Sequence, residues 1–160
     1  LHGYVTTQAA QTTQAAQTTQ AAQTQWKNLK RPDDKTDING TGGSNVIAVG
    51  GYAISDCPCC KIYHACGPKA SETNRLKDAQ EKVKELYKNM LCKAHEDVKQ
   101  CIVLPAISTS IFAGPGPDFT KKEFIIAMYE GMYQGVKAFQ RKYSKSSLLI
   151  ILKFLAPPGS

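Results

Sequence analysis

Two short apolar runs, separated by a stretch of helical periodicity, constrain the fold of this chain more than any other feature. The runs are "CIVLPAI" (Cys101 to Ile107) and "SLLIILKFL" (Ser147 to Leu155), and continuous apolar composition predicts strands buried on both faces of a parallel or mixed sheet. Between them, large apolar side chains recur at helical spacing: Phe124, Met128, Met132, Val136 and Phe139. Thr120 and Glu123 predict a capping box at the start of this helix, which continues to about Tyr143.

The segment before Cys101 has the same alternation of strands and helix. The stretches "NVIAVGG" (Asn45 to Gly51) and "KIYHACG" (Lys61 to Gly67) predict two strands separated by the turn "SDCPCC". A long helix is predicted from about Glu72 to His95, because apolar residues follow one another at three- and four-residue steps: Leu76, Ala79, Val83, Leu86, Met90, Leu91 and Ala94. This order of elements predicts an α/β fold with right-handed crossovers.

Composition limits the class of protein and leaves its partner open. The length of 160 residues fits one domain, and no segment reaches the ~18 apolar residues that span a bilayer, so we expect a soluble protein without a membrane partner. The net charge of +7 permits binding to nucleic acid, an anionic cofactor or a phosphorylated partner. Six cysteines are too few for a disulfide scaffold, and Cys66 and Cys101 fall in predicted buried strands. We therefore expect a reducing, cytoplasmic or nuclear compartment.

The N-terminal part of the chain differs in composition from the rest. Residues 1–25 contain three copies of "TTQAAQ", and a six-residue step does not keep the alanine pairs on one face of a helix. The repeat is either a helix that needs a core to dock on or disordered low complexity. Residues 26–44 are predicted to be a polar loop with turn signals, and residues 45–156 are the predicted α/β core.

The loop after the first apolar run is the candidate binding site. In an open α/β sheet, ligands bind beyond the carboxyl ends of the strands, where a loop leads into a helix whose first N–H groups are free. Residues Ser108 to Asp118 occupy that position. Hydroxyl donors come from Ser108, Thr109 and Ser110. Open backbone that could approach a phosphate comes from Ala113, Gly114 and Gly116.

Two large apolar side chains in this loop can be interpreted in two ways. Ile111 and Phe112 lie in a Gly/Pro setting, where apolar side chains have to pack on something. They could wall a ribose beside the phosphates, or the loop could be a plain connector whose Phe112 plugs the core. Asp118 is the nearest carboxylate, and we interpret it as a helix cap rather than a general base.

Two separated motifs resemble the macro domains, which are ADP-ribose-binding α/β modules. "LPAISTSIFAGPG" (Leu104 to Gly116) is similar to the family's second phosphate-binding loop, an apolar strand followed by Pro-x-Ile-Ser-Thr-Gly-Ile-Phe/Tyr-Gly. "GGYAISDCPCCKIYHACGP" (Gly50 to Pro68) is similar to the stretch in which a Gly-Tyr-x-Leu turn precedes a strand ending His-x-x-Gly-Pro. "LHGYV" (Leu1 to Val5) resembles the end of the family's first loop, Leu-x-x-Gly-Gly-Gly-Val.

The resemblance implies a fold and a set of binding residues. The fold would be a three-layer α/β/α macro-domain-like mixed sheet that lacks the family's first strands, with the "TTQAAQ" repeat in place of the first helix. The implied contacts with ADP-ribose come from both loops: Gly3, Tyr4, Val5, Ser108, Thr109, Ser110, Ile111, Phe112, Ala113 and Gly114. No cofactor and no catalytic residue are implied by the residues present.

The chain departs from the family pattern at its start and within the loops. The family usually begins with a strand whose Asp reads the adenine, followed by a strand ending Asn-Ala-Ala-Asn inside the sheet. The given sequence contains neither, and without the second strand we expect unpaired backbone between the strands that begin near Lys61 and Cys101. Tyr4 and Ser110 stand where glycines are expected, so each adds a Cβ where backbone would approach the diphosphate.

Other clusters in the sequence favour structural interpretations. Thiols and an imidazole gather in one stretch, but without zinc-ligand spacing they are expected to be packing residues rather than metal ligands: Cys57, Cys59, Cys60, His64 and Cys66. Ser108 and Ser110 lack the flanking glycines of a nucleophile elbow. Gly131 and Gly135 indicate close approach of a helix to the sheet.

Basic residues gather near the end of the second helix. These cations are expected to interact favourably with the negative end of the helix dipole: Lys137, Arg141, Lys142 and Lys145. They make a weak nucleic-acid patch, because the only aromatic residues among them are Phe139 and Tyr143.

We expect a monomer that binds ADP-ribose or ADP-ribosylated proteins. If upstream strands exist, it would also be a mono-ADP-ribosyl hydrolase that uses an ordered water. The alternative is a non-catalytic macro-like scaffold or a module that binds RNA or poly(ADP-ribose).

Overall fold

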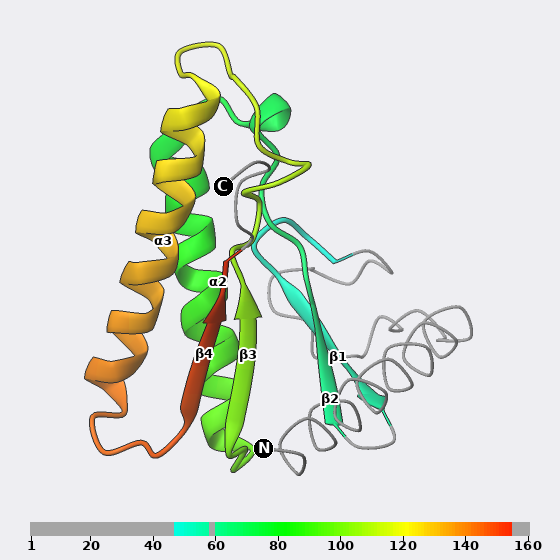
Figure 1. The fold of residues 1–160 in the computed structure, drawn as a ribbon, viewed down its shortest axis with the longest axis vertical. Coiled ribbons are helices and arrows are strands. Elements are labelled where there is room, and N and C mark those ends of the chain that lie inside the picture. The colour runs from blue at the N-terminus through cyan, green and yellow to red at the C-terminus, as the bar shows by residue number, and fades with distance from the viewer. Residues whose placement is uncertain (1–46, 58–59, 155–160) are drawn as a thin grey trace, which may run out of the picture.

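The computed structural model of the chain describes residues 47–57 and 60–154. A hairpin of β1 (Tyr52–Cys57) and β2 (Cys60–Ala65) comes first, followed by the 3-10 turn η1 (Ala70–Glu72). The remaining elements alternate along the chain: α2 (Leu76–Glu96), β3 (Cys101–Pro105), α3 (Lys121–Lys142) and β4 (Leu149–Lys153) (Figure 1). The predicted α/β class and the predicted order of helices and strands are confirmed.

The described strands form two separate two-stranded sheets. β1 and β2 are antiparallel, with Tyr52 opposite Ala65, and β3 and β4 are parallel, with Val103 opposite Ile151. The parallel pair connected through α3 agrees with the sequence prediction. Within the described residues, no backbone ladder joins β2 to β3.

The first strand begins later than predicted. A strand was expected over residues 45–51, but Ala48 accepts a hydrogen bond from the Gly51 N–H at 2.9 Å, and β1 begins only at Tyr52. Gly50 adopts a φ of +89°, a left-handed conformation that interrupts an extended strand. The turn then leads into the hairpin, because the Gly50 N–H donates to the Cys66 carbonyl at 2.7 Å. Residues 45 and 46 lie outside the described part of the chain.

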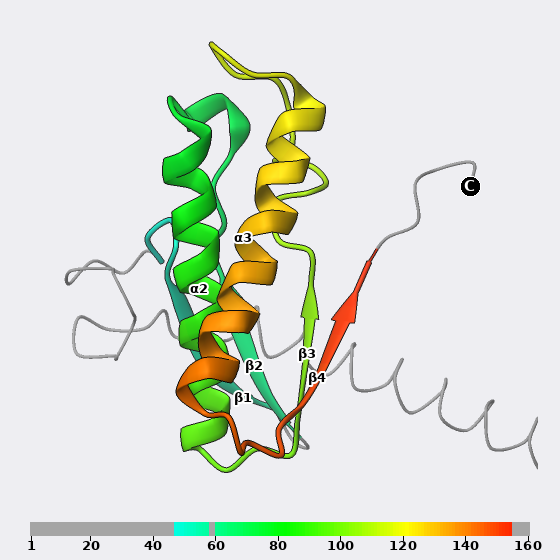
Figure 2. The ribbon, with the colours of Figure 1, turned by 90° about the vertical axis from the view of Figure 1, so that its left-hand side faces the viewer.

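Helices α2 and α3 pack side by side and cover one side of β3 and β4 (Figure 2). Gly131 and Gly135 make this close approach possible. A Cβ at Gly131 would stand 2.6 Å from the Gln80 carbonyl oxygen, and one at Gly135 would stand 2.5 Å from that of Lys84. The predicted close approach at these glycines is therefore confirmed, but the element that they approach was predicted wrongly, because they face α2 rather than a sheet.

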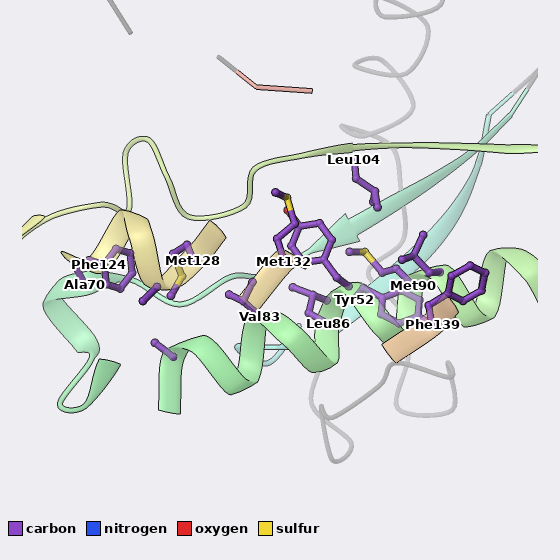
Figure 3. Close-up of a cluster of buried hydrophobic side chains, with 14 of the residues drawn as sticks. Tyr52, Ala70, Val83, Leu86, Met90, Leu104, Phe124, Met128, Met132 and Phe139 are labelled. Carbon is purple, nitrogen blue, oxygen red and sulfur yellow. The ribbon is translucent and has the colours of Figure 1, made fainter. Parts of the chain in front are cut away.

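The core lies between the helices and the two sheets. Tyr52 of β1 and Leu104 of β3 lie over the side chains of α2 and α3 (Figure 3). The largest fully buried side chains come from the helices: Tyr87, Phe124, Phe139, Leu86, Met90, Leu91, Met128 and Val83. Burial of each large apolar side chain contributes roughly 1.5–3 kcal/mol, so helix packing carries most of the stability of this region.

The face of the β3–β4 pair opposite the core is exposed. Val103, Leu149 and Ile151 are 51%, 58% and 38% exposed, whereas Leu104 is buried on the core side. Burial on both faces was predicted for these strands, and this is wrong in the described part of the chain because the helices cover one face only. The predicted burial of Cys101 is wrong for the same reason, since its side chain is exposed.

Helix α2 ends in a Schellman motif that contains a strained residue. The Lys99 N–H donates to the Ala94 carbonyl at 2.9 Å, and the Val98 N–H donates to the His95 carbonyl at 3.0 Å. Val98 occupies the left-handed position of the motif with a φ of +55°, where glycine is usual. None of the helices in the described part is long and apolar enough to cross a membrane.

Candidate ligand-binding loop

A buried tyrosine of α2 holds the start of the loop that follows β3. The hydroxyl of Tyr87 donates to the carbonyl oxygen of Pro105, the last residue of β3, and accepts the N–H of Ile107 at 2.9 Å. Burial raises the pKa of Tyr87 to about 12, so the phenol keeps its proton at neutral pH and can donate it. Tyr87 therefore holds the point where the strand becomes the loop.

The next residue of the loop has an unusual backbone conformation. Ser108 has a φ of +65°, and its buried hydroxyl has no hydrogen-bond partner among the described residues. Its side chain lies against Gly67, where a Cβ would collide with both the Ser108 hydroxyl and the Ile107 side chain. The loop after β3 therefore packs directly on the segment that follows β2.

The other two hydroxyls of the loop have different surroundings. Thr109 donates its hydroxyl hydrogen bond to the Ala106 carbonyl at 2.8 Å, which closes a local turn, whereas Ser110 is exposed. Of the three residues predicted to contact a ligand through a hydroxyl, Ser108 is buried, Thr109 is half-buried and Ser110 is exposed. A ligand at this loop would consequently be held chiefly by the backbone.

Five consecutive backbone N–H groups in the loop are unpaired within the described structure. The N–H of Ile107 is taken by Tyr87, and the N–H of Ala113 donates to the Ser110 carbonyl at 3.0 Å. Between these two anchors, the N–H groups of residues 108–112 make no hydrogen bond with any described residue. Ser108, at the start of this run, is in the left-handed region, a backbone conformation that occurs in anion-binding nests.

Phe112 is attached to the segment after β2 rather than to the core. Its carbonyl oxygen accepts the Ala70 N–H at 2.9 Å, and the Lys69 ammonium lies 5.5 Å from the centre of its ring. The residues of the loop that pack against the core are Ile107 and Ala113. The interpretation of Phe112 as a plug of the core is therefore wrong in the described structure. Ile111 is 91% exposed at the tip of the loop.

The N-terminus of α3 is capped by its own residues. The Glu123 N–H donates to the Thr120 hydroxyl at 3.2 Å, and the Thr120 N–H donates to the Glu123 carboxylate at 2.7 Å, which confirms the predicted capping box. The latter bond lowers the pKa of Glu123. Asp118 was interpreted as a helix cap, and this is wrong because Thr120 occupies that position. The Glu123 carboxylate therefore already lies at the N-terminus of α3, where negative charge is favourable.

A pocket of about 180 Å³ lies beside the segment after β2. Its lining includes Pro68 and Lys69 on one side and the start of α2 on the other, with Arg75, Asp78 and Lys82. Arg75 donates two hydrogen bonds to Asp78, at 2.9 and 2.6 Å, and this pairing lowers the pKa of Asp78. Lys69 therefore belongs both to this pocket and to the contact with Phe112.

The structure describes the predicted residues of the second loop but not those of the first. Gly3, Tyr4 and Val5 lie outside the described residues, as do the predicted repeat and the polar loop. Two residues that fix the loop were missed, Tyr87 and Lys69. A buried tyrosine at helical spacing from Val83 needs a hydrogen-bond partner, and this was the available signal for Tyr87. Lys69 had no local signal, because its contact with Phe112 joins distant parts of the chain.

Only part of the cysteine and histidine cluster lies within the described residues, since Cys59 falls outside them. No group of three or more potential ligands is found among these residues. His64 is half-buried, and burial lowers the pKa of its imidazole. Cys60 is exposed at the hairpin turn, and Cys66 is half-buried after β2.

This combination of features defines an α/β module with a candidate ligand-binding loop at the carboxyl end of a parallel strand. The macro domain family matches residues 15–121, which is more than half of the chain. The chain belongs to the macro domain family. Macro domains bind ADP-ribose in general, and membership supports this ligand class. A search of curated proteins found no significant match.

Proposed function

We propose that this protein binds ADP-ribose, free or attached to a protein, through the loop from Ser108 to Gly116. The observation that carries the proposal is the run of unpaired N–H groups at residues 108–112. Such a run, held at both ends by Tyr87 and by the turn at Ala113, is preorganised to receive the oxygens of a diphosphate. Preorganisation lowers the entropic cost of binding because the loop does not have to be ordered by the ligand.

Ile111 and Phe112 supply the apolar part of the proposed site. Ile111 is almost fully exposed, so a ribose packed against it would remove apolar surface from water. Phe112 is held in place through the Ala70 N–H and offers a fixed ring beside the phosphate-binding backbone. The ligand class therefore combines an anionic centre with a sugar, as in ADP-ribose.

Hydrolysis of ADP-ribose from a modified side chain is the finer proposal. It requires upstream strands that supply the remaining contacts, and it would proceed by attack of an ordered water. The two small sheets would then be parts of one mixed sheet in a three-layer fold. We also propose that the protein works as a monomer in the cytoplasm or nucleus.

Titration calorimetry with ADP-ribose, AMP and adenosine tests the binding proposal. We expect ADP-ribose to bind more tightly than AMP, and adenosine to bind most weakly, because the loop recognises the diphosphate. Equal millimolar responses to all three ligands would overturn the proposal. Binding of homopolymeric RNA with a steep salt dependence, without competition by ADP-ribose, would favour the alternative of a non-catalytic RNA-binding scaffold.

Two loop variants sharpen this test. Ile111→Ala is expected to weaken ADP-ribose binding without affecting folding, since the side chain is 91% exposed. Ser110→Gly is expected to strengthen binding, because it removes a Cβ from backbone that would approach the phosphates. Val103→Ala is a matched control for Ile111→Ala, since it truncates an exposed apolar side chain on the outer face of β3. Equal affinities of all three variants and the wild type would place the ligand elsewhere.

A further inference from the structure

We propose that Lys69 determines the selectivity of the loop for anionic ligands and holds Phe112 in position. This inference rests on the proposed function of the Ser108 to Gly116 loop. Lys69 lies in the segment after β2, and it reaches the loop after β3 through its ammonium group. It would act as the cation of a site whose other donors are neutral backbone groups.

The contact between Lys69 and Phe112 is supported by the backbone. The Ala70 N–H, which is next in the chain, donates to the Phe112 carbonyl at 2.9 Å and keeps the two backbone segments together, while the Lys69 ammonium lies 5.5 Å from the centre of the Phe112 ring. A cation at this distance over an aromatic face is attracted by the electron density of the ring. Lys69 and Ala70 thus hold Phe112 by its ring and by its main chain.

The loop itself carries no charge to match a diphosphate. Residues 106–117 contain no Asp, Glu, Lys or Arg, and Asp118, the first charged residue after them, has the wrong sign. Lys69 is the cation that contacts the loop side chains in the described structure. Electrostatic attraction from Lys69 would therefore add to the partial positive charges of the backbone N–H groups.

Glu72 competes with a ligand for the same ammonium. Its carboxylate accepts a hydrogen bond from the Lys69 ammonium at 3.0 Å, and the two side chains are about half exposed, at 45% for Lys69 and 59% for Glu72. An exposed pair of this kind contributes little to stability, so the ammonium can exchange Glu72 for a phosphate at low cost. The acidic partner sets how strongly Lys69 attracts the ligand.

The experiment compares Lys69→Met with Lys137→Met by calorimetry. Lys137 is the matched control, because its ammonium lies 5.6 Å from the Tyr133 ring on the exposed side of α3. We expect Lys69→Met to weaken ADP-ribose binding about fivefold, the upper end for loss of one exposed charged contact, and to leave the weak adenosine response unchanged. Lys137→Met should bind like the wild type, and Lys69→Arg should retain most of the affinity.

Salt dependence and the Glu72→Gln variant separate a charge effect from a structural one. The affinity of the wild type should fall with ionic strength more steeply than that of Lys69→Met, because exposed charges are screened. Glu72→Gln should bind about twofold more tightly, because the competing carboxylate is removed. Equal affinities of Lys69→Met and the wild type at low and high salt would overturn this inference alone. No ADP-ribose binding by the wild type would overturn the proposed function and this inference together.

Discussion

Gly67 and Ser108 are in direct contact, although they belong to segments that follow different sheets. A Cβ at Gly67 would collide with the Ser108 hydroxyl and the Ile107 side chain. We predict that Gly67→Ala lowers the free energy of unfolding by about 1–3 kcal/mol, because the loop has to move away from its anchor at Tyr87. Urea denaturation measures the change, and calorimetry should also give weaker ADP-ribose binding.

Gly114→Ala is the control for this substitution. A Cβ at Gly114 would stand 3.7 Å from that of Ala70, an ordinary contact, so its free energy of unfolding should stay within about 0.5 kcal/mol of the wild type. Equal destabilisation by the two substitutions would contradict the close approach at Gly67.

Tyr87 and the partly buried Tyr63 should respond differently to loss of the hydroxyl. Tyr87→Phe leaves the Pro105 carbonyl and the Ile107 N–H without their partner, and we predict a loss of about 1–3 kcal/mol in the free energy of unfolding. Tyr63→Phe should be neutral or slightly stabilising, because the Tyr63 hydroxyl is buried without a hydrogen-bond partner among the described residues. Urea denaturation of both variants under the same conditions tests this prediction. A larger loss of stability for Tyr63→Phe than for Tyr87→Phe would contradict the role of the Tyr87 hydroxyl in holding the loop.

The same tyrosines predict a loss of stability at alkaline pH. Burial raises the pKa of Tyr63 and of Tyr87 from 10.0 to about 12. Below pH 10 the phenols are protonated in both states, so their contribution is fully present. Between pH 10 and 12 the unfolded chain loses these protons first, so the free energy of unfolding falls as the pH rises.

Near-ultraviolet absorbance of phenolate, followed during a pH titration of the folded protein, checks this prediction. Tyr63 and Tyr87 should ionise late, as should Tyr143, whose hydrogen bond to Glu96 raises its pKa, and the Tyr87→Phe and Tyr63→Phe variants should each lose one late step. Ionisation of all seven tyrosines near pH 10 while the circular dichroism remains native would contradict it.

Val98→Gly is predicted to stabilise the protein. Val98 has a φ of +55° at the end of α2 and is 86% exposed, so glycine relieves backbone strain without loss of packing. We expect a gain of about 1 kcal/mol in the free energy of unfolding, measured with urea. Asp97→Gly is the control: its φ is −81°, and glycine there should cost about 0.5–1 kcal/mol. A loss for Val98→Gly would mean that the left-handed turn is absent in solution.

Local patterns predicted the helices and the capping box well. The helix predicted from Glu72 to His95 is observed as α2 over Leu76–Glu96, after the 3-10 turn η1. The reciprocal bonds of Thr120 and Glu123 span three residues, so the sequence alone contains both partners. Apolar spacing along one helix face is likewise a local property, and it identified most of the buried residues of α2.

Properties that depend on distant parts of the chain were predicted less well. The apolar runs of β3 and β4 predicted strands, but whether their outer face is covered depends on which layers surround them, and Cys101 and Val103 are exposed in the described structure. The loop after β3 was located from its composition. Its internal geometry depends on Tyr87 and Lys69, which come from other elements, and no local pattern reveals that Thr109 turns its hydroxyl inward.

The division of the described strands into two sheets has a consequence for cooperativity. The β1–β2 hairpin shares no hydrogen-bond ladder with β3 and β4 in the described part of the chain, so the two are coupled through side-chain packing on α2 and through the loop contacts. Amide hydrogens of the hairpin should exchange with solvent through their own opening events, as a separate foldon. A ligand held jointly by Lys69 and the backbone after Ser108 would couple the stabilities of the two foldons. Ligand binding at the loop would then slow amide exchange in the hairpin.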